Sequence, residues 1–169
     1  MIPAIIKNFN VFVDGVSMIG VAEEITLPKL GRKTEDFEAG GMGGPIELDL
    51  GQEKLEMGMT FKGWNKDVLK QYGVFAADGV PLRFRGAQRS DDADANTDAI
   101  EISVRGKFKE LDFGSTKKGE ANSLKITMPL TAFKYEINGE PLIDLDLINN
   151  IFVVDGEDRM ADERKALGI

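Results

Sequence analysis

The chain has 169 residues, of which 42% are hydrophobic and 30% charged, and its formal net charge is −8. This composition is typical of a globular protein, and the length predicts a single domain over residues 1–169. The chain contains no cysteine and no histidine, which excludes disulfides, histidine-based catalytic triads and the usual zinc sites. The acidic balance disfavours a surface that grips duplex DNA or an anionic membrane.

Neither a membrane anchor nor a secretion signal is expected. The sequence has no apolar run near the roughly 18 residues that cross a bilayer. Its start, Met1–Ile6, lacks the basic residues and the small-residue cleavage site of a signal peptide. We therefore expect the chain to be made and kept in a cytosol.

A tight hairpin is predicted near the N-terminus, where Asp14-Gly15 separates the apolar runs Phe9–Val13 and Val16–Ala22. An Asp-Gly pair fits the type I′ turn, whose twist matches that of the strands on either side.

The next stretch, residues 23–55, predicts a long β-hairpin arm that projects from the body. Both sides of it resemble strands with one polar face, and residues 46–50 alternate strictly between apolar and acidic. The bend at residues 40–45 holds four glycines, which give the backbone access to positive φ. Pro28 is expected at an edge or a bulge because proline donates no ladder hydrogen bond. A globular domain has no evident need for such an arm, so we expect it to contact a partner.

The middle of the chain predicts strands at residues 54–62, 80–88 and 100–111. A short helix should follow the first of these, with Asn65 as its N-cap, Gly73 as its stop, and one face formed by Val68, Leu69 and Tyr72. An acidic loop is expected at residues 90–98.

A long strand over Ser123–Ile137 should contain a β-bulge, because its apolar residues move from even to odd positions near Pro129 and Thr131. Asn138-Gly139 predicts a second hairpin turn, into a strand at residues 140–145. A strand at 151–154 and a helix over 157–167 are expected within a C-terminal segment, residues 151–169. The predicted fold class is mainly β: a β-sandwich or barrel-like fold with one short flanking helix, the projecting arm and a short C-terminal helix.

The sequence offers no convincing metal or phosphate site. The acidic loop resembles the first half of an EF-hand, but Thr97 stands where the calcium loop needs glycine, and Ser103 where it needs glutamate. The glycine-rich bend is not followed by a lysine or a helix, as a phosphate-binding loop would be. We expect no cofactor and no metal.

Catalysis is equally weakly supported. Two acidic pairs, Asp144 with Asp146 and Glu53 with Glu56, could be imagined as a glycosidase dyad. A chain with 29 acidic residues contains such pairs by chance, and Asp144 and Asp146 are expected on a solvated strand edge. The residues favour a protein that is not an enzyme. A ligand- or carbohydrate-binding β-sandwich that uses Trp64 and Tyr72 as a platform remains an alternative.

Four short stretches carry a resemblance to a known family: Leu27-Pro28-Lys29, Lys33-Thr34-Glu35, Gly40-Gly41-Met42 and Arg164–Gly168. With the sequence around them, which covers nearly the whole chain, they resemble the major tail tube proteins of contractile-tailed, P2-like phages and the related tubes of R-type bacteriocins.

The resemblance implies a structural subunit that forms hexameric rings, which stack into a hollow tube inside a contractile sheath. Contraction would drive the tube through the target envelope, and DNA would pass along the channel without specific binding. The implied partners are further copies of the chain and the sheath, baseplate and tail-terminator proteins. The implied location is the virion tail, assembled in the bacterial host cytoplasm. A DNA-free bacteriocin or secretion-type tube remains an alternative.

The resemblance also implies that the arm and the termini lie between subunits and rings. The candidate subunit-interface residues are Leu27, Pro28, Lys29, Lys33, Thr34, Glu35, Phe37, Gly40, Gly41, Met42, Gly43, Pro45, Ile46 and Leu48. Six copies would carry a charge of about −48 per ring, and acidic residues that face the channel would repel DNA from its wall. The acidic loop, residues 91–98, is expected to contribute to that charge.

Overall fold

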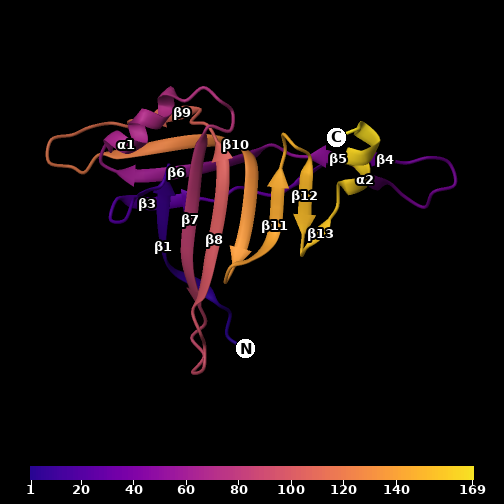
Figure 1. Cartoon of the computed structure of the whole chain (residues 1–169), viewed down its shortest axis with the longest axis horizontal. Helices are drawn as coiled ribbons and strands as arrows, with labels where there is room; N and C mark the ends of the chain where they lie inside the picture. The colour runs from indigo at the N-terminus through magenta and orange to yellow at the C-terminus, as the bar shows by residue number, and fades with distance from the viewer.

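The computed structural model describes all 169 residues and is built mainly of β-strands, with two short α-helices (Figure 1). This agrees with the predicted fold class. Its elements, in chain order, are β1 (Ile5–Val13), β2 (Val16–Ser17), β3 (Ala22–Thr26), β4 (Arg32–Phe37), β5 (Ile46–Gln52), β6 (Leu55–Lys62), α1 (Lys66–Leu69), the 3₁₀ turn η1 (Lys70–Gly73), β7 (Val80–Arg89), β8 (Asp98–Gly106), β9 (Glu110–Asp112), β10 (Ser123–Ile137), β11 (Glu140–Asp146), β12 (Ile151–Val154), β13 (Glu157–Asp158) and α2 (Ala161–Leu167).

Strand β10 belongs to two layers. Its first half, Ser123–Leu130, pairs with β6, and β3 and β9 complete this short sheet in the order β9-β10-β6-β3. Its second half belongs to a long sheet in the order β13-β12-β11-β10-β8-β7-β1-β2. In Figure 1 the strands of the two layers cross steeply. A strand that passes between crossed layers must bend, and the predicted bulge is confirmed because the β10–β8 register shifts between Leu130 and Ala132.

The core lies between the two layers. It consists of 21 buried hydrophobic residues, and no polar or charged residue is buried. Alternation along the strands supplies it: in β6 the odd-numbered residues Leu55, Met57, Met59 and Phe61 are all buried. Met128 and its neighbours at even positions of β10 lie beside them on the paired strand of the same sheet.

The turn predictions are confirmed by the backbone. Asp14 and Gly15 have φ values of +48° and +79°, and Asn138 and Gly139 have values of +51° and +82°. Positive φ at both central positions is what a type I′ turn requires. The predicted helix N-cap is also confirmed, because the side-chain oxygen of Asn65 accepts hydrogen bonds from the N–H groups that begin α1.

Several element boundaries were predicted wrongly. After the first turn, only Val16–Ser17 pairs with β1, and the chain then crosses to the short sheet as β3. The strand expected at 100–111 is broken: β8 ends at Gly106, and Phe108 enters the core before β9 begins. The C-terminal helix starts at Ala161, since residues 157–158 form β13 instead.

Two further expectations about surfaces were wrong. Tyr72 lies in η1 and is exposed, so it shares no buried helix face with Val68. Strand β11, which carries Asp144 and Asp146, lies between β10 and β12 and is not an edge strand. No helix of the structure is long and apolar enough to cross a membrane.

Candidate assembly surfaces

The predicted arm is a separate two-stranded sheet formed by β4 and β5 (Figure 1). It extends beyond α2 at one end of the molecule. The arm is shorter than the predicted range 23–55, because Ala22–Thr26 is strand β3, which pairs with β6 in the body. Leu27, Pro28 and Lys29 lie in the connection between body and arm, and Pro28 is outside any strand. We use "the arm" below for residues 32–52.

None of the fourteen candidate interface residues is buried in the subunit. Pro28 and Met42 are partly covered, and the other twelve are exposed. The structure therefore places eleven of the candidates together on the arm, Lys33 to Leu48, and the other three on its connection to the body. At the bend only Gly41 has a positive φ, +86°, while the backbone N–H of Met42 donates to the carbonyl of Ala39 and closes a turn.

The two faces of the arm differ in chemistry. Glu35 stands opposite Leu48 and Phe37 opposite Ile46, so these four side chains share one face, which is largely apolar. Leu50 was missed by the candidate list although it continues the alternation of Ile46 and Leu48, and it is 57% exposed. A solvated apolar face of this kind is costly unless another surface covers it.

The opposite face of the arm is charged. Asp36 stands opposite Glu47, and Arg32 donates hydrogen bonds to the carboxylate of Asp49. The Arg32 hydrogen bond lowers the pKa of Asp49 below its usual value, helped by the backbone N–H of Gly51. The arm carries five acidic and two basic residues, so it is negative overall.

At the base of the arm its two ends are tied to each other, and Arg32 contacts the body. Glu53 and Gln52 both donate hydrogen bonds to the carbonyl of Gly31, the first through its backbone N–H and the second through its side chain. The guanidinium of Arg32 lies 5.9 Å from the centre of the Phe152 ring in β12. These contacts direct the arm outward beside the β12–β13 end of the long sheet.

The long sheet has incompletely paired edges at both ends. At one end of the sheet, strand β1 pairs with β7 along most of its length. The other edge of β1 pairs only with the two residues of β2. At the opposite end β12 meets only the two residues of β13. Ile5 and Ile6 on the open part of β1 are 52% and 41% exposed. Unpaired backbone groups along such edges are ready to pair with another chain.

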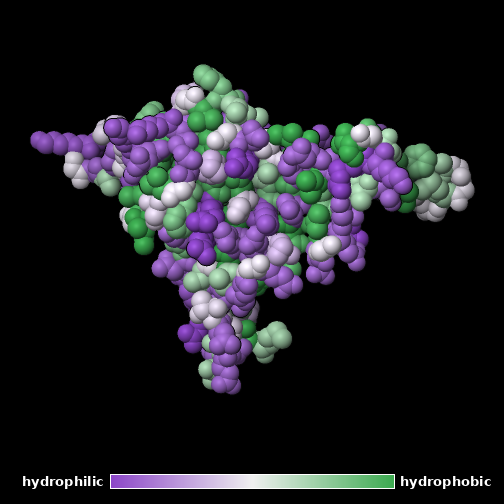
Figure 2. Space-filling view, in the orientation of Figure 1, coloured by the Kyte–Doolittle hydropathy of each residue, from purple (hydrophilic) through white to green (hydrophobic).

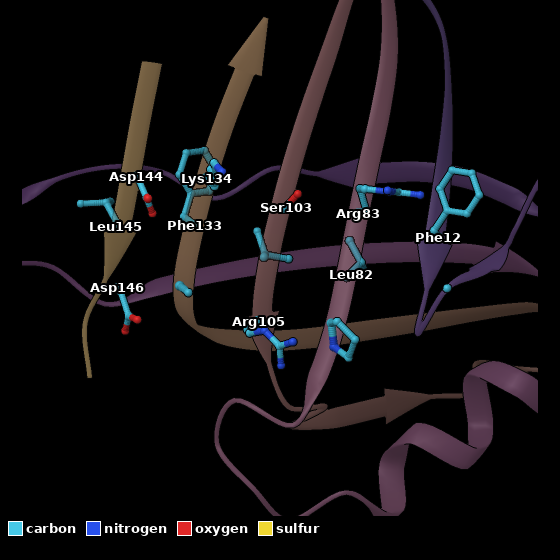
Figure 3. A pocket seen from close by; sticks show the side chains of 14 residues that line it. Phe12, Leu82, Arg83, Ser103, Arg105, Phe133, Lys134, Asp144, Leu145 and Asp146 are labelled. Atoms are coloured by element: carbon cyan, nitrogen blue, oxygen red, sulfur yellow. The ribbon is translucent and has the colours of Figure 1, made fainter. Parts of the chain in front are cut away.

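The outward face of the long sheet carries rows of mixed charge around an open groove of about 470 Å³ (Figure 3). One row runs across the strands from Arg83 through Ser103 and Lys134 to Asp144. Arg83 lies 4.8 Å from the centre of the Phe12 ring and 3.5 Å from a carboxylate oxygen of Glu101. A hydrogen bond from Lys134 to Glu136, with a distance of 3.0 Å, raises the pKa of that lysine.

Charges of the two signs are balanced on this face. Around the groove the basic residues are Arg83, Arg85, Arg105 and Lys134, and the acidic residues are Glu101, Glu136, Asp144 and Asp146; Arg89 at the end of β7 and Asp158 in β13 extend the same face. The net negative charge of the chain therefore comes from residues outside this face. The arm holds part of it, and residues 90–98, with four aspartates and no basic residue, hold another part.

The residues of the other sequence-based alternatives are dispersed. In the acidic loop Asp91 pairs with Lys7 at 2.8 Å, and Asp92 exchanges hydrogen bonds with Ser90. No group of three or more acidic side chains is arranged to hold a metal ion. Trp64 is 45% exposed and packs edge-on against Phe113, with 5.4 Å between ring centres.

An exposed two-faced arm, open strand edges and a core without polar groups define a β-structured subunit built for assembly with further chains. Comparison with known proteins shows which family of assembling proteins the chain belongs to. The family model for phage tail tube protein FII matches residues 3–168, and the chain belongs to that family. It is a structural subunit of a phage-type tail tube and a component of the virion tail.

Two curated relatives extend over almost the whole chain. The tail tube protein of Escherichia phage P2 is 38% identical over 170 residues, which cover 99% of this chain and 98% of the relative. The major tail tube protein of Serratia phage KSP20 is 33% identical over 171 residues, with the same coverage of both chains.

Solved structures with the same fold come from an extracellular contractile injection system. A chain of its sheath/tube terminator in the extended state superposes with a TM-score of 0.61 at 10% identity, over 80% of this chain and 98% of the other. A chain of its extended sheath–tube complex gives a TM-score of 0.58 at 10% identity, over 79% and 91% of the two chains. At this identity the likeness shows the fold alone.

Proposed function

We propose that copies of this chain form hexameric rings that stack into the hollow tube of a contractile tail. The observation that carries this proposal is the pair of open edges at opposite ends of the long sheet. Joining the β12–β13 end of one copy to the β1–β2 end of the next would pair their backbone groups. An interface between two different surfaces closes into a ring when its rotation completes a circle.

The outward face of the long sheet would then line the channel. Its positive and negative side chains occur within the same rows, so DNA would meet local attraction and repulsion of similar size. Such a wall supports passive passage of DNA without specific binding. Any net repulsion would come from the four aspartates of residues 90–98, if that loop points into the channel.

The arm would contact neighbouring copies through the candidate residues from Lys33 to Leu48. Covering its apolar face removes Phe37, Ile46, Leu48 and Leu50 from water, which stabilises the assembled state by roughly 25 cal/mol per Å² of apolar surface buried. Leu27, Pro28 and Lys29 would contribute through the connection at the base of the arm. The charged face would fix the orientation of the contact.

A sheath protein is the proposed partner around the tube, with baseplate and tail-terminator proteins at its ends. The injection-system structures that share this fold are described as sheath–tube and terminator assemblies, which supports the proposal. We further propose that the subunit has no catalytic activity and assembles in the host cytoplasm. Driving the tube through a target envelope is a mechanical task that needs no chemistry from these residues.

The test compares the purified wild-type chain with a double variant, Phe37→Ser and Ile46→Ser, by electron microscopy and sedimentation. Both side chains are on the arm and outside the buried core, so the circular dichroism spectrum and Tm of the subunit should not change. We expect the wild type to form tubes and the variant to remain unassembled. A control change away from the arm, Lys70→Gln at the exposed surface of η1, should leave the tubes intact. Tubes of normal width and number from the double variant would disprove the assembly role of the arm.

A further inference from the structure

The end of the molecule opposite the arm carries an exposed loop with two lysines and one glutamate, Glu120. In Figure 1 the connection between β9 and β10 forms one end of the long axis, and the tip of the arm forms the other. Figure 2 shows that the first end is strongly hydrophilic, whereas the tip of the arm is pale green and white. The connection contains Lys117 and Lys118, and neither lysine forms an ion pair within the subunit.

Two exposed aromatic residues lie at the root of this loop. Phe113 begins the connection, and the backbone N–H of Gly63, the residue before Trp64, donates to the carbonyl of Asn122 at its end. Trp64 and Phe113 pack edge-on, with an interplanar angle of 88°, yet they remain 45% and 44% exposed. An aromatic pair left half in water, at the root of a loop that carries two lysines, has the composition of an interface centre. We call Trp64, Phe113, Lys117 and Lys118 the aromatic–lysine patch.

The arm has the complementary composition. Its apolar face offers Phe37, Ile46 and Leu48 to an aromatic surface. Four of its acidic residues, Glu35, Asp36, Glu38 and Glu47, form no ion pair within the subunit, because only Asp49 is paired with Arg32. The unpaired acids of the arm and the unpaired lysines of the patch are therefore available to each other.

We propose that the arm of one copy docks on the aromatic–lysine patch of the next copy around the ring. The two surfaces lie at opposite ends of the long axis, so each copy uses its arm once and its patch once, as a head-to-tail ring requires. The same two copies would also join their long sheets, because the arm lies beside the β12–β13 end and the patch is at the end toward β1. This inference rests on the proposed ring and names the surface that receives its arm.

Charge reversal in two separate variants tests the docking. Variant A carries Lys117→Glu and Lys118→Glu, which makes the patch acidic. Variant B carries Glu35→Lys and Glu38→Lys, which replaces the acid on the apolar face of the arm and the next acid after Phe37 by lysine. All four side chains are exposed, so each subunit should keep the wild-type Tm. Alone, each variant should need about a tenfold or higher concentration to assemble, because like charges would face each other at every contact.

Mixing the two variants supplies the control. In a ring that alternates A and B, the basic arm of B meets the acidic patch of A, and the unchanged arm of A meets the unchanged patch of B. An equal mixture should therefore regain tubes, as should one chain that carries all four changes. Variants that assemble alone as well as the wild type, or a mixture that remains unassembled, would overturn the docking. A wild-type chain that forms no rings would instead disprove the proposed function.

Trp64 gives an independent readout because it is the only tryptophan in the chain. Docking of the arm would remove its exposed part from water, so its emission should shift to shorter wavelength and resist quenching by iodide when wild-type tubes form. Wild-type tubes in which Trp64 keeps the emission and quenching of the free subunit would overturn the docking.

Discussion

Replacing Gly106 by alanine is predicted to destabilise the subunit at the point where its two layers meet. Gly106 ends β8, opposite Leu130 of β10 and Val80 of β7. A Cβ built at this position would lie 3.1 Å from the carbonyl carbon of Pro129 and 3.2 Å from the Cα of Leu130, and closer still to the carbonyl oxygen of Pro129. These are backbone atoms of a doubly paired strand, so no side-chain rotation can relieve the contact.

The cost should lie near the upper end of the range for overpacking, about 3 kcal/mol. In a protein of this size each kcal/mol lowers Tm by about 2–4 °C, which gives a loss of roughly 6–12 °C. The assay is thermal and urea unfolding of unassembled subunits, followed by circular dichroism. The matched control is Gly73→Ala, since an added Cβ there meets no atom within 4 Å and the backbone has no positive φ.

Equal stabilities of the Gly106→Ala and Gly73→Ala proteins would show that the added Cβ does not strain the backbone at Pro129 and Leu130. That result would mean that β10 can move away from β8 at little cost, and that the bulge beside Pro129 does not hold the two layers in a fixed relation. The expected result would also lower tube yield, because the open edges of the long sheet depend on the same layer geometry.

Three further changes have definite expected outcomes. Gly41→Val should weaken tube assembly more than Gly43→Val, because Gly41 has a φ of +86° and Gly43 has no positive φ; equal tube yields would show that the conformation of Gly41 does not matter for assembly. Asn65→Ala should cost about 1 kcal/mol, or roughly 2–4 °C in Tm, because it removes the side-chain cap of α1; an unchanged Tm in thermal unfolding would contradict this. The hydrogen bond from Arg164 lowers the pKa of Asp158. This pair therefore stabilises α2 fully at a pH above the ordinary pKa of about 3.8, and the stabilisation is lost as the pH falls through the lowered pKa. NMR shifts of residues 161–167 should change in that acid range in the wild type and not in Asp158→Asn, and identical titrations would argue against the pair.

Local chemistry made the turns and the core of this fold predictable. Asp14-Gly15 and Asn138-Gly139 require positive φ at both positions, and almost no other dipeptide is as well suited. Burial in β6 and β10 followed from alternation alone, including the shift of phase beside Pro129. In each case the deciding interaction is between residues close in sequence.

What the sequence could not reveal was which strand pairs with which. The break after Gly106 depends on the backbone of β10, more than twenty residues away, and no local pattern records that contact. Asp144 was expected on an edge strand because alternation shows only that its side chain faces solvent. It does not show that β12 pairs with the free side of β11. Likewise, the sequence did not show that only Val16–Ser17 would pair with β1 before the chain crosses to the short sheet as β3.

The sequence predicted the arm as a hairpin, but it did not predict the full apolar face of the arm or the patch proposed to receive it. Alternation placed Ile46 and Leu48 on one face, and register then added Phe37 opposite Ile46. The sequence singled out Trp64 but paired it with Tyr72; its contact with Phe113, 49 positions away, forms only in the fold.

Cryo-electron microscopy of the purified chain at raised concentration tests the proposed tube. We expect stacked rings around an open channel, with the long sheets of neighbouring copies joined edge to edge and the outward face that carries Arg83 and Asp144 turned to the channel. Tubes whose channel is lined by the short sheet, or a subunit that stays monomeric at every concentration, would contradict it.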